Sequence, residues 1–197
     1  MNFRYWLRRP WLIWPRLRYW WWERRNPEKP WLTPGAVSFL DAHLTFAMTG
    51  LEFGSGRSTA WFAGKLQSLT SVEHHAGWHA IVTEQLAKSG RTNVDYRLIP
   101  LEHPEAEGEQ SEYDPTPNYV AVVNAFPDSS LDLAVVDGHY RSHCIQAVLT
   151  KLKRGGLLLV DDANLWPGNA PPVPGNWTEV SRTTNGLKFT VIWRKPG

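Results

Sequence analysis

The chain has 197 residues, of which 42% are hydrophobic. This length suffices for one α/β domain with a buried core and is short for two. The single cysteine, Cys144, excludes an intramolecular disulfide and a zinc site built from several cysteines, and favours a reducing, cytoplasmic compartment. Residues 1–31 carry eight basic and two acidic side chains, whereas the rest of the chain carries 13 and 17. The globular part therefore lacks the charge of a nucleic-acid-binding protein, and we expect no nucleic-acid partner.

Residues 1–25 form a basic arm with six of the twelve tryptophans and seven arginines. Its apolar runs are far shorter than the roughly 18 residues of a membrane-spanning helix. Pro10 and Pro15 are expected to interrupt a continuous helix. On a helical wheel one set of apolar residues falls within an arc of roughly 120°; it comprises Phe3, Leu7, Trp11, Trp14, Leu17 and Trp21.

Two interpretations of this arm stay open. Tryptophans beside cations suit peripheral contact with the inner face of a membrane through residues 1–25. Alternatively, the arm packs on its own domain or on a second subunit, and the oligomeric state is not determined by the sequence. We expect residues 1–30 to form an arm and linker, and residues 31–197 to form the domain.

From residue 35 onward, short apolar runs alternate with longer mixed segments, which is typical of parallel strands joined by helices. The expected helices are 36–47, the segment from the glycine turn to residue 66, 77–88, 119–125 and 140–153. The expected strands are 50–53, 69–73, 94–99, 131–137, 156–161, 177–183 and 187–194. Thr184-Asn-Gly predicts a hairpin between the last two strands. The prediction is an α/β, Rossmann-like sheet of five parallel strands plus a C-terminal antiparallel hairpin, with helices on both faces.

Residues 101–118 interrupt this alternation with six acidic side chains and three prolines. We expect a solvated loop or lid there. We call this segment the lid.

Ligands in open α/β sheets bind beyond the carboxyl ends of the strands, where several polar residues gather in this sequence. The stretch LEFGSGRST (51–59) lies between an expected strand and an expected helix, and Glu73 ends the next strand 19 residues after Gly54. That interval suits a carboxylate that accepts hydrogen bonds from both hydroxyls of a ribose. Thr59 occupies the place of the third glycine of a dinucleotide fingerprint, and Glu52 would repel a phosphate.

These motifs together resemble the class I S-adenosylmethionine-dependent methyltransferases over residues 36–195. The residues that carry the resemblance are Glu52-x-Gly54-x-Gly56-x-Ser58-Thr59, Glu73, Val136-Asp137-Gly138 and the segment Lys153–Asp162. The resemblance implies S-adenosylmethionine as cofactor. It implies that Glu52, Gly54, Ser55 and Gly56 surround the methionine end, with Ser58 and Thr59 in the same cofactor-binding turn. It also implies that Glu73 holds the ribose with His74 alongside, that Ile99 borders the adenine, and that Asp137 and Gly138 lie below the methyl group.

The sequence after the fifth strand, Asp161-Asp-Ala-Asn-Leu-Trp166, is similar to the cation-dependent catechol and caffeoyl-CoA O-methyltransferases. That similarity implies magnesium bound by Asp137, Asp161 and Asp162, with oxygen ligands that suit this ion. The alternative is that Asp161 and Asp162 cap the strand and accept hydrogen bonds from loop amides. The metal question therefore stays open.

His139 directly follows Asp137-Gly138 and is the candidate base, since histidine titrates near neutrality; a solvent-exposed helix start is the alternative. Asp137, His139 and Asp161 are the catalytic candidates. Arg141 either holds an anionic substrate or pairs with Asp137, and Trp78 is expected to pack between helices.

The expected function is methyl transfer to an oxygen of a small or lipid-linked acceptor. The alternative is a membrane-associated binding or scaffold protein that keeps the methyltransferase fold without turnover.

Overall fold

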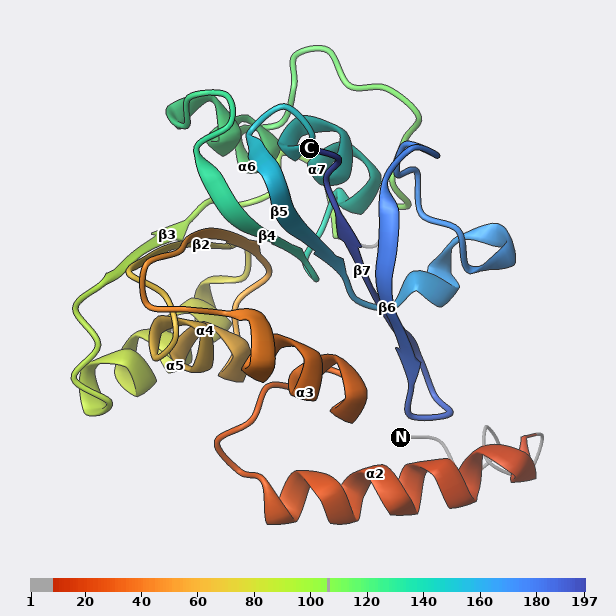
Figure 1. The fold of residues 1–197 in the computed structure, drawn as a ribbon. Helices are drawn as coiled ribbons and strands as arrows, with labels where there is room; N and C mark the ends of the chain where they lie inside the picture. The colour runs from red at the N-terminus through yellow and green to blue at the C-terminus, as the bar shows by residue number, and fades with distance from the viewer. Residues whose placement is uncertain (1–8, 106) are drawn as a thin grey trace.

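The computed structural model describes residues 9–105 and 107–197. Phe3 and Leu7 of the arm lie outside the described residues. A seven-stranded sheet with the order β3-β2-β1-β4-β5-β7-β6 forms the centre of the molecule (Figure 1). Its strands are β1 (Thr49–Phe53), β2 (Ser68–Glu73), β3 (Val94–Leu98), β4 (Leu131–Val136), β5 (Leu152–Val160), β6 (Thr178–Thr184) and β7 (Phe189–Arg194).

Strands β1 to β5 are parallel, and β7 pairs antiparallel with both β5 and β6. The predicted sheet of five parallel strands with a C-terminal hairpin is therefore confirmed. The order reverses at β1, which pairs with β2 on one side and with β4 on the other. A ligand site is expected at this reversal, where the loops after β1 and β4 diverge.

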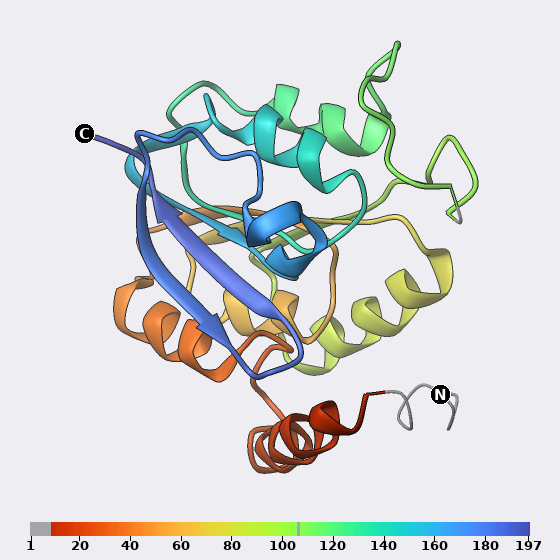
Figure 2. The ribbon, with the colours of Figure 1, turned by 90° about the vertical axis from the view of Figure 1, so that its right-hand side faces the viewer.

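Helices cover both faces of the sheet (Figure 2). One face carries α3 (Pro34–His43), α4 (Arg57–Ala63) and α5 (Ala76–Lys88), and the other carries α6 (Asn118–Ala121), the 3-10 helix η2 (Val122–Ala125) and α7 (Arg141–Val148). Because side chains alternate along a strand, Leu133 and Val135 of β4 join the first core, whereas Ala134 and Val136 join the second. Between β5 and β6 lie only the 3-10 turns η3 (Ala163–Leu165) and η4 (Pro167–Asn169).

Three expected helices are shorter in the structure. The helix expected to reach residue 66 is α4, which ends at Ala63 before a turn at Gly64. The helix expected at 36–47 is α3 (Pro34–His43), which stops because Leu44 has extended backbone. The helix expected at 140–153 is α7 (Arg141–Val148). It stops early because Leu152 already pairs with Leu131, so that β5 begins four residues before the predicted strand.

The N-terminal arm forms the 3-10 turn η1 (Pro10–Leu12) followed by the helix α2 (Ile13–Arg25). Pro15 does not interrupt α2, contrary to the prediction, because it lies in the first turn, where the backbone N–H has no partner inside the helix. No helix among the described residues is long and apolar enough to span a membrane.

One face of α2 packs on the domain. Tyr19 is buried, donates a hydrogen bond to the carbonyl of Leu32 (3.1 Å) and stacks on Trp22 with ring centroids 5.7 Å apart. Pro15 lies against the hairpin tip, since a Cβ added to Gly186 would come within 2.7 Å of the Pro15 Cβ. The interpretation that the arm packs on its own domain is therefore correct for the face of α2 that carries Tyr19.

The opposite face of α2 and η1 is open to solvent. Its large apolar side chains are the described part of the predicted stripe, namely Trp11 (68% exposed), Trp14 (73%), Leu17 (47%) and Trp21 (56%). About half or more of each of these side chains is exposed, so the arm presents an aromatic surface away from the sheet. We call this surface the exposed arm face.

Candidate functional site

The two loops that follow β1 and β4 meet at a pair of glycines. Gly54 has a φ of +90°, a backbone conformation that favours glycine. A Cβ added to Gly54 would lie 2.6 Å from the Cα of Gly138, and a Cβ added to Gly138 would lie 2.1 Å from the hydroxyl oxygen of Tyr119. Neither position has room for a side chain. The glycines therefore allow the backbones to touch at the switch in strand order.

Glu52 lies beneath this turn, fully buried. Its Oε2 accepts hydrogen bonds from the hydroxyls of Thr59 (2.7 Å) and Ser71 (2.6 Å), and the Thr59 hydroxyl accepts one from the N–H of Gly56 (3.0 Å). Burial raises the pKa of Glu52 to about 6, although hydroxyl hydrogen bonds, with Ser58 the largest of them, oppose that shift. The carboxyl side chain supports the glycine turn from behind.

Glu73 ends β2 and faces the same turn. Its Oε2 accepts hydrogen bonds from the N–H (3.2 Å) and the hydroxyl (2.8 Å) of Ser55, and its Oε1 accepts from the N–H groups of His74 (2.9 Å) and His75 (2.8 Å). The Ser55 hydroxyl also lies 2.6 Å from the hydroxyl of Tyr96. A ribose that bonds to Glu73 therefore has to compete with the Ser55 hydroxyl.

A cavity of about 360 Å³ opens at these strand ends. It collects residues from the carboxyl ends of β1, β2 and β4, from the start of α5 and from the lid; its lining is Gly54, Ser55, Glu73, His74, His75, Trp78, Glu105, Asp137, Gly138 and His139. Six candidate residues of the sequence lie outside this lining: Glu52, Gly56, Ser58, Thr59, Ile99 and Asp161. Ile99 follows β3, and its N–H donates to the carbonyl of Glu73 (2.8 Å).

Trp78 is a site residue that sequence reasoning assigned to helix packing. Its indole N–H donates to the carbonyl of Ser55 (2.7 Å), and its ring stacks on Trp31 with centroids 6.0 Å apart. The available signal was its position in the first turn of α5, whose N-cap residue His75 accepts a hydrogen bond from the Trp78 N–H (3.1 Å). The position of Glu105 in the cavity lining was also missed, because the lid has no periodic sequence pattern from which its fold could be predicted.

Two histidines that line this cavity, His74 and His139, lie beside a third, His103. The ring of His139 lies 5.7 Å from that of His74 and 5.4 Å from that of His103, which comes from the lid. The Nε2 atom of His139 is buried and has no hydrogen-bond partner within residues 9–105 and 107–197. Burial lowers the pKa of His139, and the neighbouring His74 and His103 lower it further. His139 is therefore neutral at physiological pH and has a nitrogen free to accept a proton.

The three aspartates proposed as magnesium ligands do come together. One oxygen from each of Asp137, Asp161 and Asp162 lies within 4.8 Å of the other two. Asp161 is buried, pairs with Lys188 and accepts a hydrogen bond from Thr190 (2.5 Å). Burial and the charge of Asp161 raise the pKa of Asp137 above its usual range.

Arg141 completes this charge cluster. Its guanidinium pairs with Asp137 (3.2 Å) and Asp162 (3.4 Å) and donates to the backbone carbonyls of Asp137, Gly138 and Asp161. It thereby joins the ends of β4 and β5. Arg141 and Lys188 already supply the positive charge that a magnesium ion would bring, so this set of residues does not fit a resident divalent cation. Of the two roles expected for Arg141, the structure therefore shows pairing with Asp137 and not an open guanidinium that could bind an anionic substrate.

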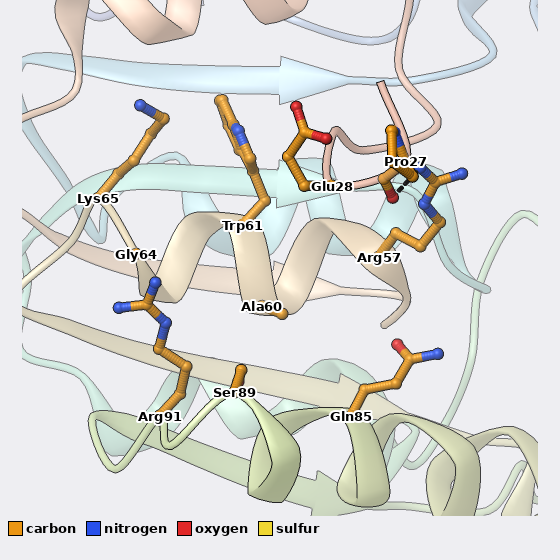
Figure 3. Close-up of a pocket in the computed structure, with 10 residues that line it drawn as sticks. All are labelled: Pro27, Glu28, Arg57, Ala60, Trp61, Gly64, Lys65, Gln85, Ser89 and Arg91. Carbon is orange, nitrogen blue, oxygen red and sulfur yellow. Dashed lines mark hydrogen bonds between the residues drawn. The ribbon is translucent and has the colours of Figure 1, made fainter. Parts of the chain in front are cut away.

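A larger cavity of about 580 Å³ lies elsewhere, between α4, α5 and the linker after α2 (Figure 3). Its cations have structural roles. Arg57 donates to the backbone carbonyls of Asn26 and Pro27, and Lys65 pairs with Asp41 (2.6 Å). Lys65 and Arg91 follow the C-terminal ends of α4 and α5, where positive charge complements the helix dipole. This cavity therefore offers no candidate for the chemistry.

The fold and the cavity at the strand ends define an α/β enzyme with a ligand site at the switch point. A family model described as a methyltransferase domain matches residues 51–163. This range is more than half of the chain and includes every residue that lines the 360 Å³ cavity. The chain belongs to this methyltransferase family and is an S-adenosylmethionine-dependent methyltransferase.

Solved structures agree on the fold. A methyltransferase from Geobacter sulfurreducens has a TM-score of 0.61 and 11% identity, with 93% of this chain and 89% of that chain covered. An rRNA methylase from Streptococcus thermophilus has a TM-score of 0.58 and 16% identity, with 81% and 93% covered. The Streptococcus mutans protein SMU.1697c, in complex with SAH, has a TM-score of 0.54 and 12% identity, with 80% and 94% covered. No curated protein sequence matches the chain.

Proposed function

We propose that the protein methylates an oxygen of a small or lipid-linked acceptor and that His139 takes the proton of the acceptor hydroxyl. The observation that carries this proposal is the buried, unpartnered Nε2 of His139 beside Gly138 in the cavity. When bound, S-adenosylmethionine supplies an electrophilic methyl group. The chain then has to align the acceptor with it and remove one proton.

We propose cofactor roles for the residues that line the cavity and for those next to it. Gly54, Ser55 and Gly138 present backbone to the methionine end, with Gly56 continuing the turn, and Glu73 meets the ribose after the Ser55 hydroxyl moves. Ile99 lies at the end of β3, at the border proposed for the adenine. Glu52, Ser58 and Thr59 act from behind by holding the turn, and His74 lines the cavity beside Glu73.

The two aspartates act differently. Asp137 lines the cavity and brings a carboxyl group, paired with Arg141, to the side of the sulfonium, whereas Asp161 is a positioning residue that holds Lys188 and the hairpin. No step of the proposed reaction passes through a metal ion.

The cofactor site is tested by calorimetry with S-adenosylmethionine and S-adenosylhomocysteine. Glu73→Gln is expected to weaken binding by about 1–3 kcal/mol, because charged hydrogen bonds to the ribose are lost. Glu84→Gln, an exposed carboxylate on α5, is the matched control and should bind as the wild type does. Unchanged affinity in Glu73→Gln would remove Glu73 from the site, and a thermal melt of each variant verifies folding.

The base is tested by mass spectrometry after incubation with S-adenosylmethionine and pools of phenols, alcohols, amines, thiols and lipid extract. Methylation of a hydroxyl compound is expected, with kcat lowered about 10²- to 10⁴-fold in His139→Gln and S-adenosylhomocysteine affinity retained. Cofactor binding without methylation of any pool would support a scaffold role instead.

We also propose that the exposed arm face rests on an anionic membrane surface. Trp11, Trp14 and Trp21 are more than half exposed, and cations surround them along the arm. Aromatic rings prefer the headgroup region, and arginines are attracted to anionic lipid. This contact would bring the enzyme to a lipid-linked acceptor.

Flotation with vesicles of phosphatidylcholine and phosphatidylserine tests the arm. The wild type is expected to float, and the triple variant Trp11→Ser, Trp14→Ser, Trp21→Ser to stay in the dense fraction. Phe46→Ser is the control, since Phe46 is 66% exposed outside the arm. Equal flotation of the wild type and the triple variant would overturn the membrane proposal.

A nucleic-acid acceptor is not part of the proposal. The lid beside the cavity carries six acidic side chains and no lysine or arginine, and such a surface repels a phosphodiester backbone. Adding a total RNA pool to the same methylation assay checks this point, with no methyl incorporation expected.

A further inference from the structure

A separate cavity of about 390 Å³ lies under the lid. Its walls come from the lid, from the first residue of α6 and from Tyr140 at the start of α7. No residue lines both this cavity and the cofactor cavity. His103 lines the lid cavity and His139 lines the cofactor cavity, and their rings lie 5.4 Å apart. The linings of the two cavities therefore meet at this pair of imidazoles.

Aromatic rings form much of the wall. The Tyr140 ring stands edge-on to those of Tyr113 (5.1 Å, 89°) and His103 (5.0 Å, 90°). The rings of His103 and Tyr113 are parallel to each other, with centroids 5.8 Å apart. The Tyr140 ring is thus perpendicular to the two parallel rings of His103 and Tyr113 in the cavity wall.

The Tyr140 hydroxyl is the unexplained polar group of this region. Tyr140 is only 2% exposed and lines the cavity, and among the described residues its hydroxyl lies near Glu102 without a hydrogen bond of acceptable geometry. Burial, together with the charge of nearby Glu102, raises the pKa of Tyr140 to about 12, so the hydroxyl stays protonated. Buried polar groups in proteins are nearly always bonded, which indicates that a ligand partner belongs here.

The acidic side chains in the lining of the lid cavity indicate that this ligand carries a positive charge. Glu102, Glu112 and Asp114 line it, and none of the three forms an ion pair within the part of the chain that the structure describes. Glu102 has one oxygen engaged by the N–H of Asn118 (2.8 Å). Glu112 and Asp114 remain free to meet a positive charge.

We propose that the lid cavity binds the ammonium group of a small cationic methyl acceptor. Carboxylates and aromatic rings are the groups that recognise organic cations in proteins, and the Tyr140 hydroxyl accepts an N–H hydrogen bond from the ammonium group. The volume limits the occupant to a small molecule. This inference rests on the proposed function, because the acceptor hydroxyl then extends past His103 to His139.

Three phenols that differ mainly in the charge of their side chain test the proposal by calorimetry on protein saturated with S-adenosylhomocysteine. The probes are tyramine (cationic), 4-ethylphenol (neutral) and 4-hydroxyphenylacetate (anionic). Tyramine is expected to bind about ten-fold more tightly than 4-hydroxyphenylacetate, with 4-ethylphenol between them. Equal affinities, or tighter binding of the anion, would overturn the proposal.

Two variants test whether the preference for tyramine arises in the lid cavity. Glu112→Gln/Asp114→Asn is expected to weaken tyramine binding about five-fold or more and to leave 4-ethylphenol binding unchanged, because only the charge is removed. Tyr140→Phe is expected to weaken tyramine binding through the lost hydroxyl acceptor. Glu107→Gln is the control, since this lid carboxylate does not line the cavity. Tyramine affinity that is unchanged in both site variants would contradict the assignment.

Binding of S-adenosylhomocysteine is measured first for every variant. Loss of that binding in the wild type would mean that the proposed function fails. Retained cofactor binding with no preference for tyramine would mean that only the lid cavity is wrongly assigned.

Discussion

The contact between Gly54 and Gly138 shows how few side chains the switch point tolerates. The two backbones lie so close that a single methyl group on Gly138 would overlap the Tyr119 hydroxyl and approach the Gly54 nitrogen to 2.8 Å. Tyr119 is fully buried and has no room to retreat. This pair of residues therefore couples the stability of the core to the shape of the cofactor cavity.

Gly138→Ala is expected to destabilise the protein by about 1–3 kcal/mol, since the added methyl group overpacks a closed contact. Denaturant unfolding measures this loss, and calorimetry should show weaker S-adenosylmethionine binding in the same variant. Gly175→Ala is the control, because a Cβ there meets no atom within 4 Å. Equal midpoints for the two variants would contradict the tight contact.

Glu52 makes the stability depend on pH in a defined direction. Its pKa is raised from 4.5 to about 6 by burial, so the folded protein holds a proton that the unfolded chain has already released. The contribution of Glu52 to stability therefore decreases as pH rises from about 4.5 to about 6 and stays lower by about 2 kcal/mol at higher pH.

Glu52→Gln removes this dependence. The free energy of unfolding of the variant minus that of the wild type is expected to rise by about 2 kcal/mol between pH 4 and pH 7, since other titrating groups cancel in the difference. Urea unfolding over that range measures it. A difference that is constant with pH would mean that Glu52 ionises normally in the fold.

Individual residues also show which features of the site the sequence could predict and which it could not. The interval between Gly54 and Glu73 placed both at one cavity because parallel strands end at the same edge of a sheet. The family resemblance placed Glu52 at the methionine end of the cofactor, and in the structure its carboxyl group bonds to the buried hydroxyls of Thr59 and Ser71 behind the turn. Trp78 was missed because only the packing of α5 against the turn reveals which face of the helix the indole occupies.

At the scale of elements, α2 is held to the domain by few contacts. Tyr19 donates a hydrogen bond to the linker carbonyl of Leu32, Trp22 packs against the core beneath α3, and Pro15 lies against Gly186. Burial of such an aromatic side chain supplies a large share of the binding of a short helix to a domain.

Tyr19→Ala is therefore expected to release α2 while the sheet stays folded. Amide hydrogen exchange in residues 13–25 should accelerate at least about ten-fold, as local opening costs less without the docked ring. Trp14→Ala, which removes a 73% exposed ring from the same helix, is the control and should exchange as the wild type does. Unchanged exchange in Tyr19→Ala would show that α2 is held by other contacts.

The order and type of the main elements were predictable because apolar runs of strand length alternate with amphipathic segments. The residues at which the helices and strands begin and end were less predictable. The start of β5 at Leu152 depends on pairing with Leu131 across the sheet, and no local pattern records that partner. For α2 the sequence left two interpretations open for a similar reason, since the exposed tryptophans and the docked Tyr19 differ only in which neighbours they contact in the fold.

Over the whole molecule, charge is polarised. The arm carries the excess of positive charge, and the acidic lid lies at the opposite end of the molecule from α2 (Figure 1). The globular remainder has four more acidic than basic side chains. Long-range attraction to an anionic surface therefore favours approach with the arm first.

Salt tests this orientation. Flotation of the wild type with anionic vesicles is expected to fall several-fold between about 0.05 M and 0.5 M salt, because the Debye length shrinks from roughly 14 Å to 4 Å. Binding to purely zwitterionic vesicles should be weaker and nearly independent of salt. Salt-independent binding to both kinds of vesicle would show that the arginines do not contribute.

The hairpin tip has a practical consequence for protein engineering. Pro15 of the arm touches Gly186, and two residues further on Lys188 pairs with Asp161 at the end of β5. A truncation at residue 30, the boundary that composition suggests, would leave the tip without its neighbour and loosen a lysine that neutralises a buried carboxylate. Shortened versions of this enzyme should thus keep α2, and surface substitutions are the cleaner way to alter what the arm binds.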